Sequence, residues 1–276
     1  MVEDVKSRPD DTRTFSLEAR SLAPSHAAVR KCVIVASHPR SGTHLTIDFI
    51  RRNFPKLNTD LRIWQSAGGL YWNLDNTSST GPGGRFPITR GGHVIAKTHK
   101  GGVCFDIDHV IERCGTANVL CIYPFRLFSR TIKGFAEFMS FRGSISEFVE
   151  TEDRFFGLDR SVADCVTYHA KTWLQNTAQR TIFLNIDNLI RDPIRAAAAL
   201  EAQLDEPAVE LDRRLPHSKR WKGGKISELY ERMTGRESTA VVVYRSAVSW
   251  HGEAERRQID RRFEDIWAAL QSRQIN

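Results

Sequence analysis

The stretch KCVIVASHPRSGTH, residues Lys31–His44, decides the fold of this chain. Its first half is a run of apolar and β-branched residues, which is typical of a strand buried on both faces. A glycine-containing turn follows. The next residues, LTIDFIRRNF, place apolar side chains at Leu45, Ile47, Phe49 and Ile50, with the spacing of a helix. A strand, a glycine turn and a helix in this order form the first unit of a doubly wound α/β fold.

The turn itself has the composition of an anion cradle. A helix N-terminus offers backbone N–H groups and the positive end of the helix dipole. Gly42 lets the backbone approach an anion, Ser41 and Thr43 add hydroxyl donors, and Arg40 adds a forked positive charge. A Pro-Arg turn with a simple N-cap is the alternative for so short a peptide. The flanking strand and helix favour phosphate binding.

Further strands and helices alternate along the chain. Strands are predicted at 93–99, 118–123 and 181–186, and helices at 105–114, near 128–138, within 160–179, at 194–204 and at 253–272. This alternation predicts one α/β domain over residues 30–276, with a central parallel sheet flanked by helices. Residues 1–29 are polar and predict a loose N-terminal arm, and residues 66–92 predict a long loop that is either functional or disordered.

The charge composition limits which classes of partner are expected. The 276 residues carry 40 Lys and Arg against 33 Asp and Glu, a formal charge of +7, which suits an anionic ligand without identifying it. The basic residues are scattered, with local density at 213–225 and 256–262, and for either cluster taken alone a solvated basic surface is the favoured interpretation. A nucleic-acid binder favours a basic stripe with interleaved aromatics, so no nucleic-acid partner is predicted.

The cysteines and the N-terminus indicate the compartment. Five cysteines without CxxC spacing predict reduced thiols and no metal ligands: Cys32, Cys104, Cys114, Cys121 and Cys165. The first residues lack the apolar core of a signal peptide, and no apolar run approaches the ~20 residues needed to span a bilayer. We therefore expect a cytoplasmic protein without a membrane span.

The turn resembles the 5′-phosphosulfate loop of sulfotransferases that use 3′-phosphoadenosine-5′-phosphosulfate (PAPS), in which P-[K/R]-S-G-T-T lies between a strand and a helix. The resemblance, to the soluble and bacterial type, implies a P-loop-like sulfotransferase fold. It implies that the phosphosulfate is held by Arg40, Ser41, Gly42, Thr43 and His44. His44 replaces the second Thr of the motif. Leu45 stands where many members have a Trp that packs on the adenine.

The triplet Lys97-Thr98-His99 ends the strand predicted at 93–99, at the edge where open α/β sheets bind ligands. Transfer of a sulfuryl group to a hydroxyl needs a base near the acceptor oxygen and positive charge near the departing oxygen. A neutral imidazole at His99 suits the first task, and Lys97 and Arg40 suit the second. The resemblance supports this assignment, because soluble sulfotransferases carry K-T-H here with the His as catalytic base. His93 and His44 are the alternative bases.

The segment NVLCIYPFRLFSRTIKGF resembles the part of the family that holds the 3′-phosphate through an Arg and a Ser. Arg126 matches the Arg, but Gly134 occupies the position of the Ser. Ser129, Arg130 and Thr131 are candidates to compensate, and Arg130 is favoured by its charge.

Two other segments match the family more loosely. The loop Lys222-Gly223-Gly224-Lys225 resembles a diverged form of the C-terminal R-x-G-x-x-G-x-W segment and predicts a phosphate contact, with a flexible basic loop as the alternative. His169 and Trp173 match a Y-x-H-x-x-x-W helix that lacks its adenine-contacting Tyr. We therefore predict that both are core residues.

Together these features predict a sulfotransferase that passes a sulfuryl group from PAPS to a hydroxyl or amine of a small-molecule acceptor, without a metal. A small-molecule kinase is the first alternative, although the sequence lacks the GxxxxGK[ST] loop and a strand-end Asp for Mg²⁺. A non-enzymatic module that binds a polyanion such as RNA is the second. Residues 66–92 and 139–153 are expected to form the walls of the acceptor site, with aromatic contacts from Tyr71, Trp72, Phe86 and Phe141.

Overall fold

A parallel sheet forms the centre of the molecule, with strand order β2-β3-β1-β4-β5. The computed structural model describes residues 31–57, 71–75, 93–102, 106–114, 118–153, 155, 159–176, 180–208 and 252–275. The predicted arm at 1–29 and the predicted loop at 222–225 lie outside these residues. The strands are β1 (Lys31–Ala36), β2 (Trp72–Asn73), β3 (His93–Thr98), β4 (Val119–Phe125) and β5 (Thr181–Asn185).

The central strand β1 is buried along its whole length and pairs with β3 on one side and β4 on the other. Its alternate residues face opposite sides of the sheet and enter two apolar clusters. Val33 and Val35 pack with Phe49 of α1 and Leu200 of α7. Cys32 and Ile34, on the other face, pack in the cluster that contains Trp173 of α5 and Phe263. The continuous apolar run therefore reflects a strand covered on both faces, as predicted.

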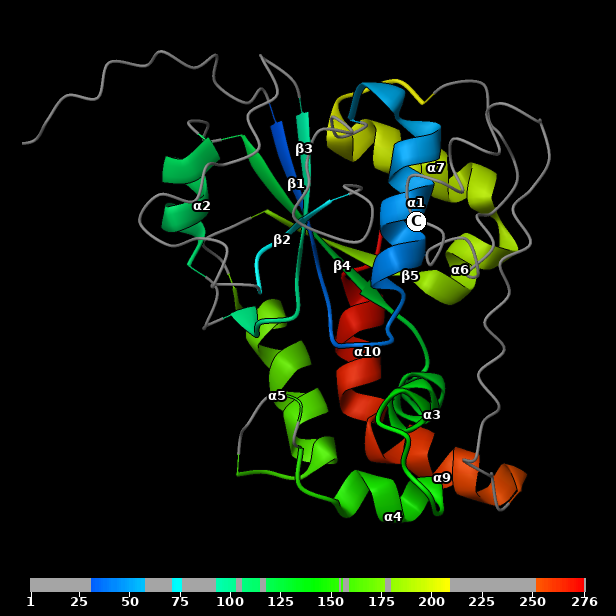
Figure 1. Ribbon diagram of the computed structural model, residues 1–276. Helices are drawn as coiled ribbons and strands as arrows, with labels where there is room; N and C mark the ends of the chain where they lie inside the picture. The colour runs from blue at the N-terminus through cyan, green and yellow to red at the C-terminus, as the bar shows by residue number, and fades with distance from the viewer. Residues whose placement is uncertain are drawn as a thin grey trace, which may run out of the picture.

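The helices cover both faces of this sheet (Figure 1). Helices α1 (Thr43–Asn53), α6 (Ile186–Arg191) and α7 (Pro193–Leu204) lie on one side. The other side has α2 (Ile107–Cys114), α5 (Val162–Gln175) and α10 (Glu264–Ser272). Helices α3 (Phe128–Phe138), α4 (Ile145–Glu150) and α9 (Glu253–Arg262) gather beyond the carboxyl ends of the strands. A short 3₁₀ turn, η1 (Pro55–Leu57), follows α1. This single α/β domain confirms the predicted fold class.

Local signals in the sequence explain several helix starts. Ser144 and Glu147 form a reciprocal capping box at α4, and Ser161 accepts a hydrogen bond from the Asp164 amide at the start of α5. Helix α7 begins with Pro193 at its first position, after Asp192 accepts from the Arg195 amide. These caps fix where each of the three helices begins.

Three elements differ from the sequence prediction. The predicted loop at 66–92 contains β2, which pairs with β3 in parallel, and its Trp72 is buried in the core. Ile186, predicted as strand, begins α6. The predicted helix at 253–272 is two helices that meet at Phe263, whose ring stacks on Phe128 at 4.8 Å. Two residues of strand and a one-residue break are too short to produce a periodic pattern.

Cys32, Cys121 and Cys165 are buried and form no disulfide within the described residues, in agreement with the prediction of reduced cysteines for these three. Within the described residues, no helix has the length and apolar character needed to cross a membrane.

Candidate active site

The turn between β1 and α1 lies at the carboxyl edge of the sheet. The Ser37 amide donates to the Thr98 carbonyl at 3.2 Å, so the turn is tied to the end of β3. The hydroxyls of Ser37 and Thr43 lie 2.5 Å apart. Helix α1 starts at Thr43 without a side-chain cap, and the first amides of an α-helix have no intrahelical acceptor. The turn therefore has the backbone geometry of an anion site.

Glycine is required at position 42. Its φ angle is 110°, and a Cβ placed there would lie 2.6 Å from the Ile186 side chain. Ile186 belongs to α6, which follows β5, so the turn and α6 pack directly against each other. The sequence signal Ser-Gly-Thr thus reflects both a left-handed backbone and a close approach.

Two arginines meet beside this turn. Arg40 has a φ angle of 70° and is exposed, and Arg126 follows β4 directly. A Cβ at Gly134 of α3 would lie 2.9 Å from Arg126 Nη2 and 3.6 Å from Arg40 Nε. The lack of a side chain at Gly134 therefore makes room for the guanidinium of Arg126, with Arg40 next to it. The structure thus brings together three positions that the sequence linked to the two phosphates.

Arg126 is held in an unusual state for an arginine. Nη2 donates to the Arg130 carbonyl at 2.9 Å, while Nε is buried without a hydrogen-bond partner among the described residues. Burial, followed by the nearby charge of Arg40, lowers the pKa of Arg126 to about 10. A buried donor without a partner and two adjacent like charges both favour an anion at this position.

The residues expected to compensate for Gly134 are engaged elsewhere. Arg130 pairs with Asp187 of α6 at 2.5 Å. The hydroxyl of Ser129 donates to Asp260 of α9 at 2.9 Å, and its amide donates to the same carboxylate at 3.0 Å. Thr131 is buried. Arg130 is thus close to Arg126 through its carbonyl, while its charge is balanced by Asp187.

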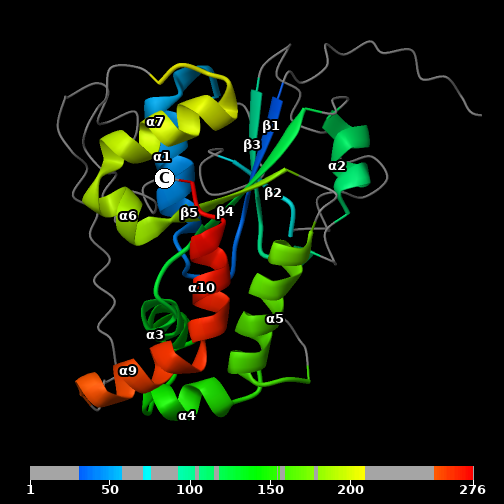
Figure 2. The same ribbon diagram turned by 180° about the vertical axis from the view of Figure 1, so that it is seen from behind.

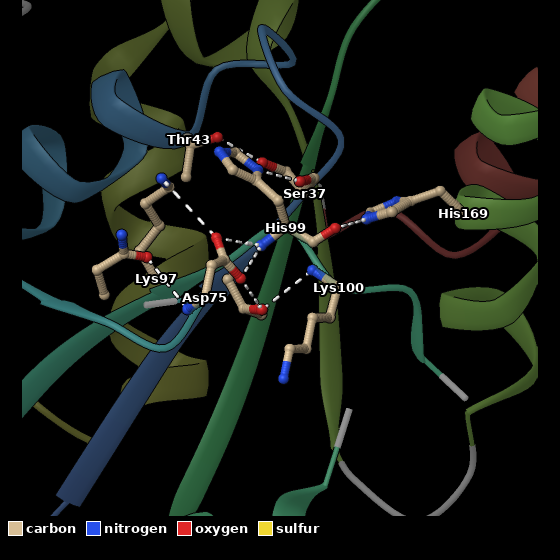
Figure 3. A network of polar contacts seen from close by, with 9 residues as sticks. Ser37, Thr43, Asp75, Lys97, His99, Lys100 and His169 are labelled. Carbon is tan, nitrogen blue, oxygen red and sulfur yellow. Dashed lines mark hydrogen bonds and ion pairs between the residues drawn. The ribbon is translucent and has the colours of Figure 1, made fainter. Parts of the chain in front are cut away.

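His99 reaches from the end of β3 to the turn after β1. Its Nδ1 lies 2.6 Å from the Ser37 carbonyl oxygen (Figure 3). A carbonyl only accepts, so Nδ1 carries the hydrogen and the neutral ring has its lone pair on Nε2. Burial, followed by the charge of Lys97, lowers the pKa of His99 well below 6.5. The imidazole is therefore neutral at pH 7, as a general base must be.

The backbone of His99 is also fixed on both sides. Its amide lies 2.9 and 3.0 Å from the two carboxylate oxygens of Asp75, and its carbonyl accepts from His169 Nε2 at 3.0 Å. That carbonyl only accepts, so His169 carries its hydrogen on Nε2, and the hydroxyl of Tyr123 in β4 donates to Nδ1 at 3.1 Å. Trp173 Nε1 donates to the Lys100 carbonyl at 3.0 Å. His169 and Trp173 are buried, as predicted, and their polar atoms also hold the strand end that carries His99.

Asp75 is a site residue that the sequence analysis missed. It lies two residues after the end of β2, and its oxygen Oδ2 lies 4.0 Å from Lys97 Nζ. The segment around it has no hydrophobic period, and a single aspartate in such a segment carries no signal of its own. The one hint in the sequence was the adjacent apolar pair, Tyr71 and Trp72, which indicates a short buried strand.

The two alternative bases lie in different surroundings. His93 begins β3, at the opposite edge of the sheet from His99, and its Nε2 lies 3.7 Å from Glu206. Its position makes it unsuitable as a base at this site, which corrects that alternative. His44, in the first turn of α1, packs on Tyr71 at 5.9 Å between ring centroids. Burial, then Lys97 and Arg40, lower the pKa of His44 to about 3.

Aromatic side chains lie beside His99, although they are not those expected. Tyr71 and Trp72 are core residues, and Phe141 packs on Phe148. Phe86 lies outside the described residues. The Phe155 ring is 6.0 Å from the His99 ring and 6.1 Å from that of Phe138. The Phe155 and Phe138 rings are 37% and 49% exposed, so an apolar surface borders the imidazole.

No group of three or more His, Cys, Asp or Glu side chains is placed to hold a metal ion within the described ranges. Lys222, Gly223 and Gly224 lie outside those ranges.

Solved structures of sulfotransferases are similar to this chain. Mouse sulfotransferase SULT7A1, crystallised with PAP, superposes with a TM-score of 0.54 and 16% identity over 90% of each chain. The sulfotransferase domain of a Synechococcus olefin synthase superposes with a TM-score of 0.42 and 14% identity, over 87% of this chain and 97% of that domain. No protein-family model matches, and no curated protein matches significantly. The likeness to the mouse enzyme and the five-stranded parallel sheet show that this chain has the sulfotransferase fold.

Proposed function

We propose that this protein is a sulfotransferase that takes a sulfuryl group from PAPS and passes it to a hydroxyl or amine of a small molecule, with His99 as general base. The observation that carries the proposal is the hydrogen bond from His99 Nδ1 to the Ser37 carbonyl. It joins a neutral imidazole to the turn whose backbone suits an anion. A base and an oxyanion cradle in contact are the two parts that sulfuryl transfer needs.

The arginines support the choice of cosubstrate. Bound PAPS supplies the sulfuryl group and a 5′-phosphate that can leave. The turn at Arg40–His44 would hold its phosphosulfate. Arg126, with its buried Nε lacking an acceptor in the described part of the chain, would hold the 3′-phosphate, with Arg40 beside it. The mouse neighbour was crystallised with PAP, which fits this choice.

Each side chain would have a defined task in the transfer. His99 Nε2 accepts the proton of the acceptor hydroxyl, since Nδ1–H is engaged by Ser37. The acceptor oxygen then bonds to sulfur as the bond from sulfur to the bridging phosphate oxygen breaks. Lys97, Arg40 and the N-terminus of α1 stabilise the charge that develops on that bridging oxygen. No metal is needed for these steps.

The acceptor would lie against Phe138 and Phe155. The exposed Phe155 ring lies beside His99 and next to the exposed Phe138 ring, so the two rings leave an apolar wall that a flat acceptor can cover. Segment 139–153 follows Phe138 directly, in line with its expected role in the acceptor site. The proposed domain, residues 30–276, would therefore bind PAPS at the turn and the acceptor at this wall.

The test is transfer of labelled sulfate from PAPS. The protein is incubated with labelled PAPS and panels of phenols, steroids, sugars and amines, and labelled products are separated. A sulfated product with at least one panel supports the proposal. Transfer from labelled ATP, or salt-sensitive binding to RNA without a preference for adenosine 3′,5′-bisphosphate, would favour the kinase or the polyanion-binding alternative.

A further inference from the structure

Asp75 is anchored by the strand end that carries the base. Thr98 Oγ1 donates to its Oδ1 at 2.7 Å, and the His99 amide lies within 3.0 Å of both oxygens. The amide of Asp75 itself donates to Asn73 Oδ1 at 3.2 Å. The carboxylate is therefore fixed in position and orientation by its own strand and by β3 (Figure 3).

Lys97 is close to this carboxylate without being tightly bound to it. Its Nζ lies 4.0 Å from Oδ2, beyond the length of a strong charge-assisted hydrogen bond. Thr98 and His99 already donate hydrogen bonds to the two oxygens of Asp75, so the Lys97 amine remains at a longer distance from them. A lysine amine sits on a flexible stem, whereas the anchored carboxylate cannot follow it.

Asp75 supplies the negative charge in the surroundings of Lys97. The other titratable groups that face this region are Tyr71, with the amine 5.9 Å from its ring centroid, His44, Arg40 and His99. Burial raises the pKa of Tyr71 to about 12, and the two imidazoles are neutral at pH 7. Burial lowers the pKa of Lys97, and Asp75 opposes that effect. Within the described ranges, Asp75 is the acid within ion-pair distance of Lys97.

We propose that Asp75 is a positioning residue for Lys97. Its carboxylate keeps the buried amine protonated before the cosubstrate binds, and the amine then moves from Asp75 to the anionic group of the bound cosubstrate. This inference rests on the proposed function for the identity of that anion. The charge of Lys97 would then be present in both states, first neutralised by a fixed carboxylate and then by the phosphosulfate. Without this partner, burial would favour the neutral amine, which cannot assist the transfer by its charge.

The first experiment needs no ligand. Lysine side chains are labelled with ¹³C, the Lys97 signal is assigned by its loss in Lys97→Met, and the amine is titrated in wild type, Asp75→Asn and Glu150→Gln. The Asn oxygen can still accept from Thr98 and His99, so the anchor is kept while the charge is removed. Glu150 of α4 pairs with Arg262 of α9 and not with Lys97, and its substitution changes the net charge by the same amount. We expect Lys97 to titrate at lower pH in Asp75→Asn only. The same pH in all three proteins would overturn the inference.

The second experiment tests the exchange. Saturating adenosine 3′,5′-bisphosphate should return the titration of Lys97 in Asp75→Asn toward that of wild type, because the phosphate replaces the lost charge. In wild type at pH 7 the nucleotide should change the chemical shift of the ¹³C-labelled Asp75 carboxyl carbon, since the amine has left it. A carboxyl signal that is unchanged in saturated wild type would show that Lys97 stays with Asp75, and the exchange would be wrong. This measurement also decides the question if Asp75→Asn does not fold.

The two proposals fail separately. If wild type does not bind the nucleotide at all, the proposed function is wrong, while the titration without ligand still decides whether Asp75 holds the charge of Lys97. If the nucleotide binds and sulfate is transferred, but Lys97 titrates at the same pH in Asp75→Asn as in wild type, the function stands and Asp75 has only a structural role.

Discussion

At the scale of single residues, the reactivity of the site comes from neighbours that lie far away in the sequence. His99 receives its tautomer from Ser37, its backbone position from Asp75 and His169, and its low pKa from burial and Lys97. None of these contacts changes the imidazole itself. They select which nitrogen can accept a proton and keep it unprotonated.

Replacement of His99 separates chemistry from binding. Because a general base acts in the transition state, His99→Ala should lower kcat by about 10²- to 10⁴-fold. It should leave the affinity for adenosine 3′,5′-bisphosphate, measured by calorimetry, close to that of wild type. Since burial holds the pKa of His99 well below 6.5, wild-type kcat should also stay level from pH 8 down through pH 6. Near wild-type turnover of the variant across pH 6–8 would assign the base to another residue.

Arg126 should discriminate between nucleotides. If it binds the 3′-phosphate, Arg126→Ala should weaken adenosine 3′,5′-bisphosphate by roughly 10- to 100-fold, as expected for a hydrogen bond to a charged group. It should barely affect 5′-AMP, which lacks that phosphate. Calorimetry with both nucleotides gives the answer, and an equal loss for both would refute this role.

Gly134→Ala is the matched test of the space beside Arg126. The new Cβ would lie 2.9 Å from Nη2, the mobile end of the arginine, so the guanidinium has to move while the helix backbone does not. The melting temperature should be kept or raised, since Ala is favoured over Gly within helices by about 1 kcal/mol. Affinity for the bisphosphate should nevertheless fall. Unchanged affinity would mean that the position of Arg126 is not important for binding.

At the scale of elements, α9 organises the region beyond the sheet edge (Figure 2). Its Asp260 accepts from the amide and hydroxyl of Ser129 in α3, and its Glu255 accepts from the amide and hydroxyl of Ser146 in α4. The same arrangement, a serine that donates twice to one carboxylate, thus attaches two helices to a third. Through α3, this attachment reaches Gly134 and Arg126.

Loss of one such attachment should lower stability. Asp260→Ala removes both acceptors of Ser129, which is fully buried, and should cost about 1–3 kcal/mol. In a chain of this size that corresponds to a melting temperature lower by roughly 2–10 °C. Asp265→Ala, an exposed aspartate in α10, is the control and should change little. Equal effects of the two substitutions, measured by calorimetric melting, would contradict the assigned role of Asp260.

Local patterns in the sequence were sufficient to predict four of the five strands and part of the candidate site. The buried strands β1, β3 and β4 are continuous apolar runs, and the turn Arg40–His44 has a motif, so the positions of Arg126 and His99 at the strand ends could be predicted as well. The role of Asp75 could not, because it depends on the parallel pairing of β2 with β3, a contact between segments about twenty residues apart. The hydrogen bond from Ser129 to Asp260 spans 131 positions and has no local signature either.

At the scale of the whole molecule, buried neutral histidines link stability to pH. Burial lowers the pKa of His38 to about 4, and the pKa values of His44 and His169 to about 3. The unfolded chain binds protons at these positions below about pH 6.5, so the free energy of unfolding should decrease as the pH falls from 6.5 toward 4. Each histidine contributes at most about 1.4 kcal/mol per pH unit. Urea unfolding at pH 7 and pH 5 tests this, and His44→Gln should reduce the difference. Equal stability at the two pH values would be incompatible with neutral buried rings.

Binding of the cosubstrate should stabilise the entire fold. Adenosine 3′,5′-bisphosphate should raise the melting temperature in a concentration-dependent way. At 100 times its Kd it should raise the free energy of unfolding by about 2.7 kcal/mol. ATP with Mg²⁺ should do much less. Greater stabilisation by ATP with Mg²⁺ would point to the kinase alternative.

The attachment of α3 to Asp260 also sets the order in which the protein can mature on the ribosome. The turn after β1 and the strand that carries His99 are synthesised before α3, but the acceptor for Ser129 follows that serine by 131 positions. A nascent chain can therefore assemble its sheet before α3 has its permanent support. Ser129 of α3 can form its hydrogen bonds to Asp260 only after α9 has left the exit tunnel. The support that α3 gives to the position of Arg126 is therefore completed late.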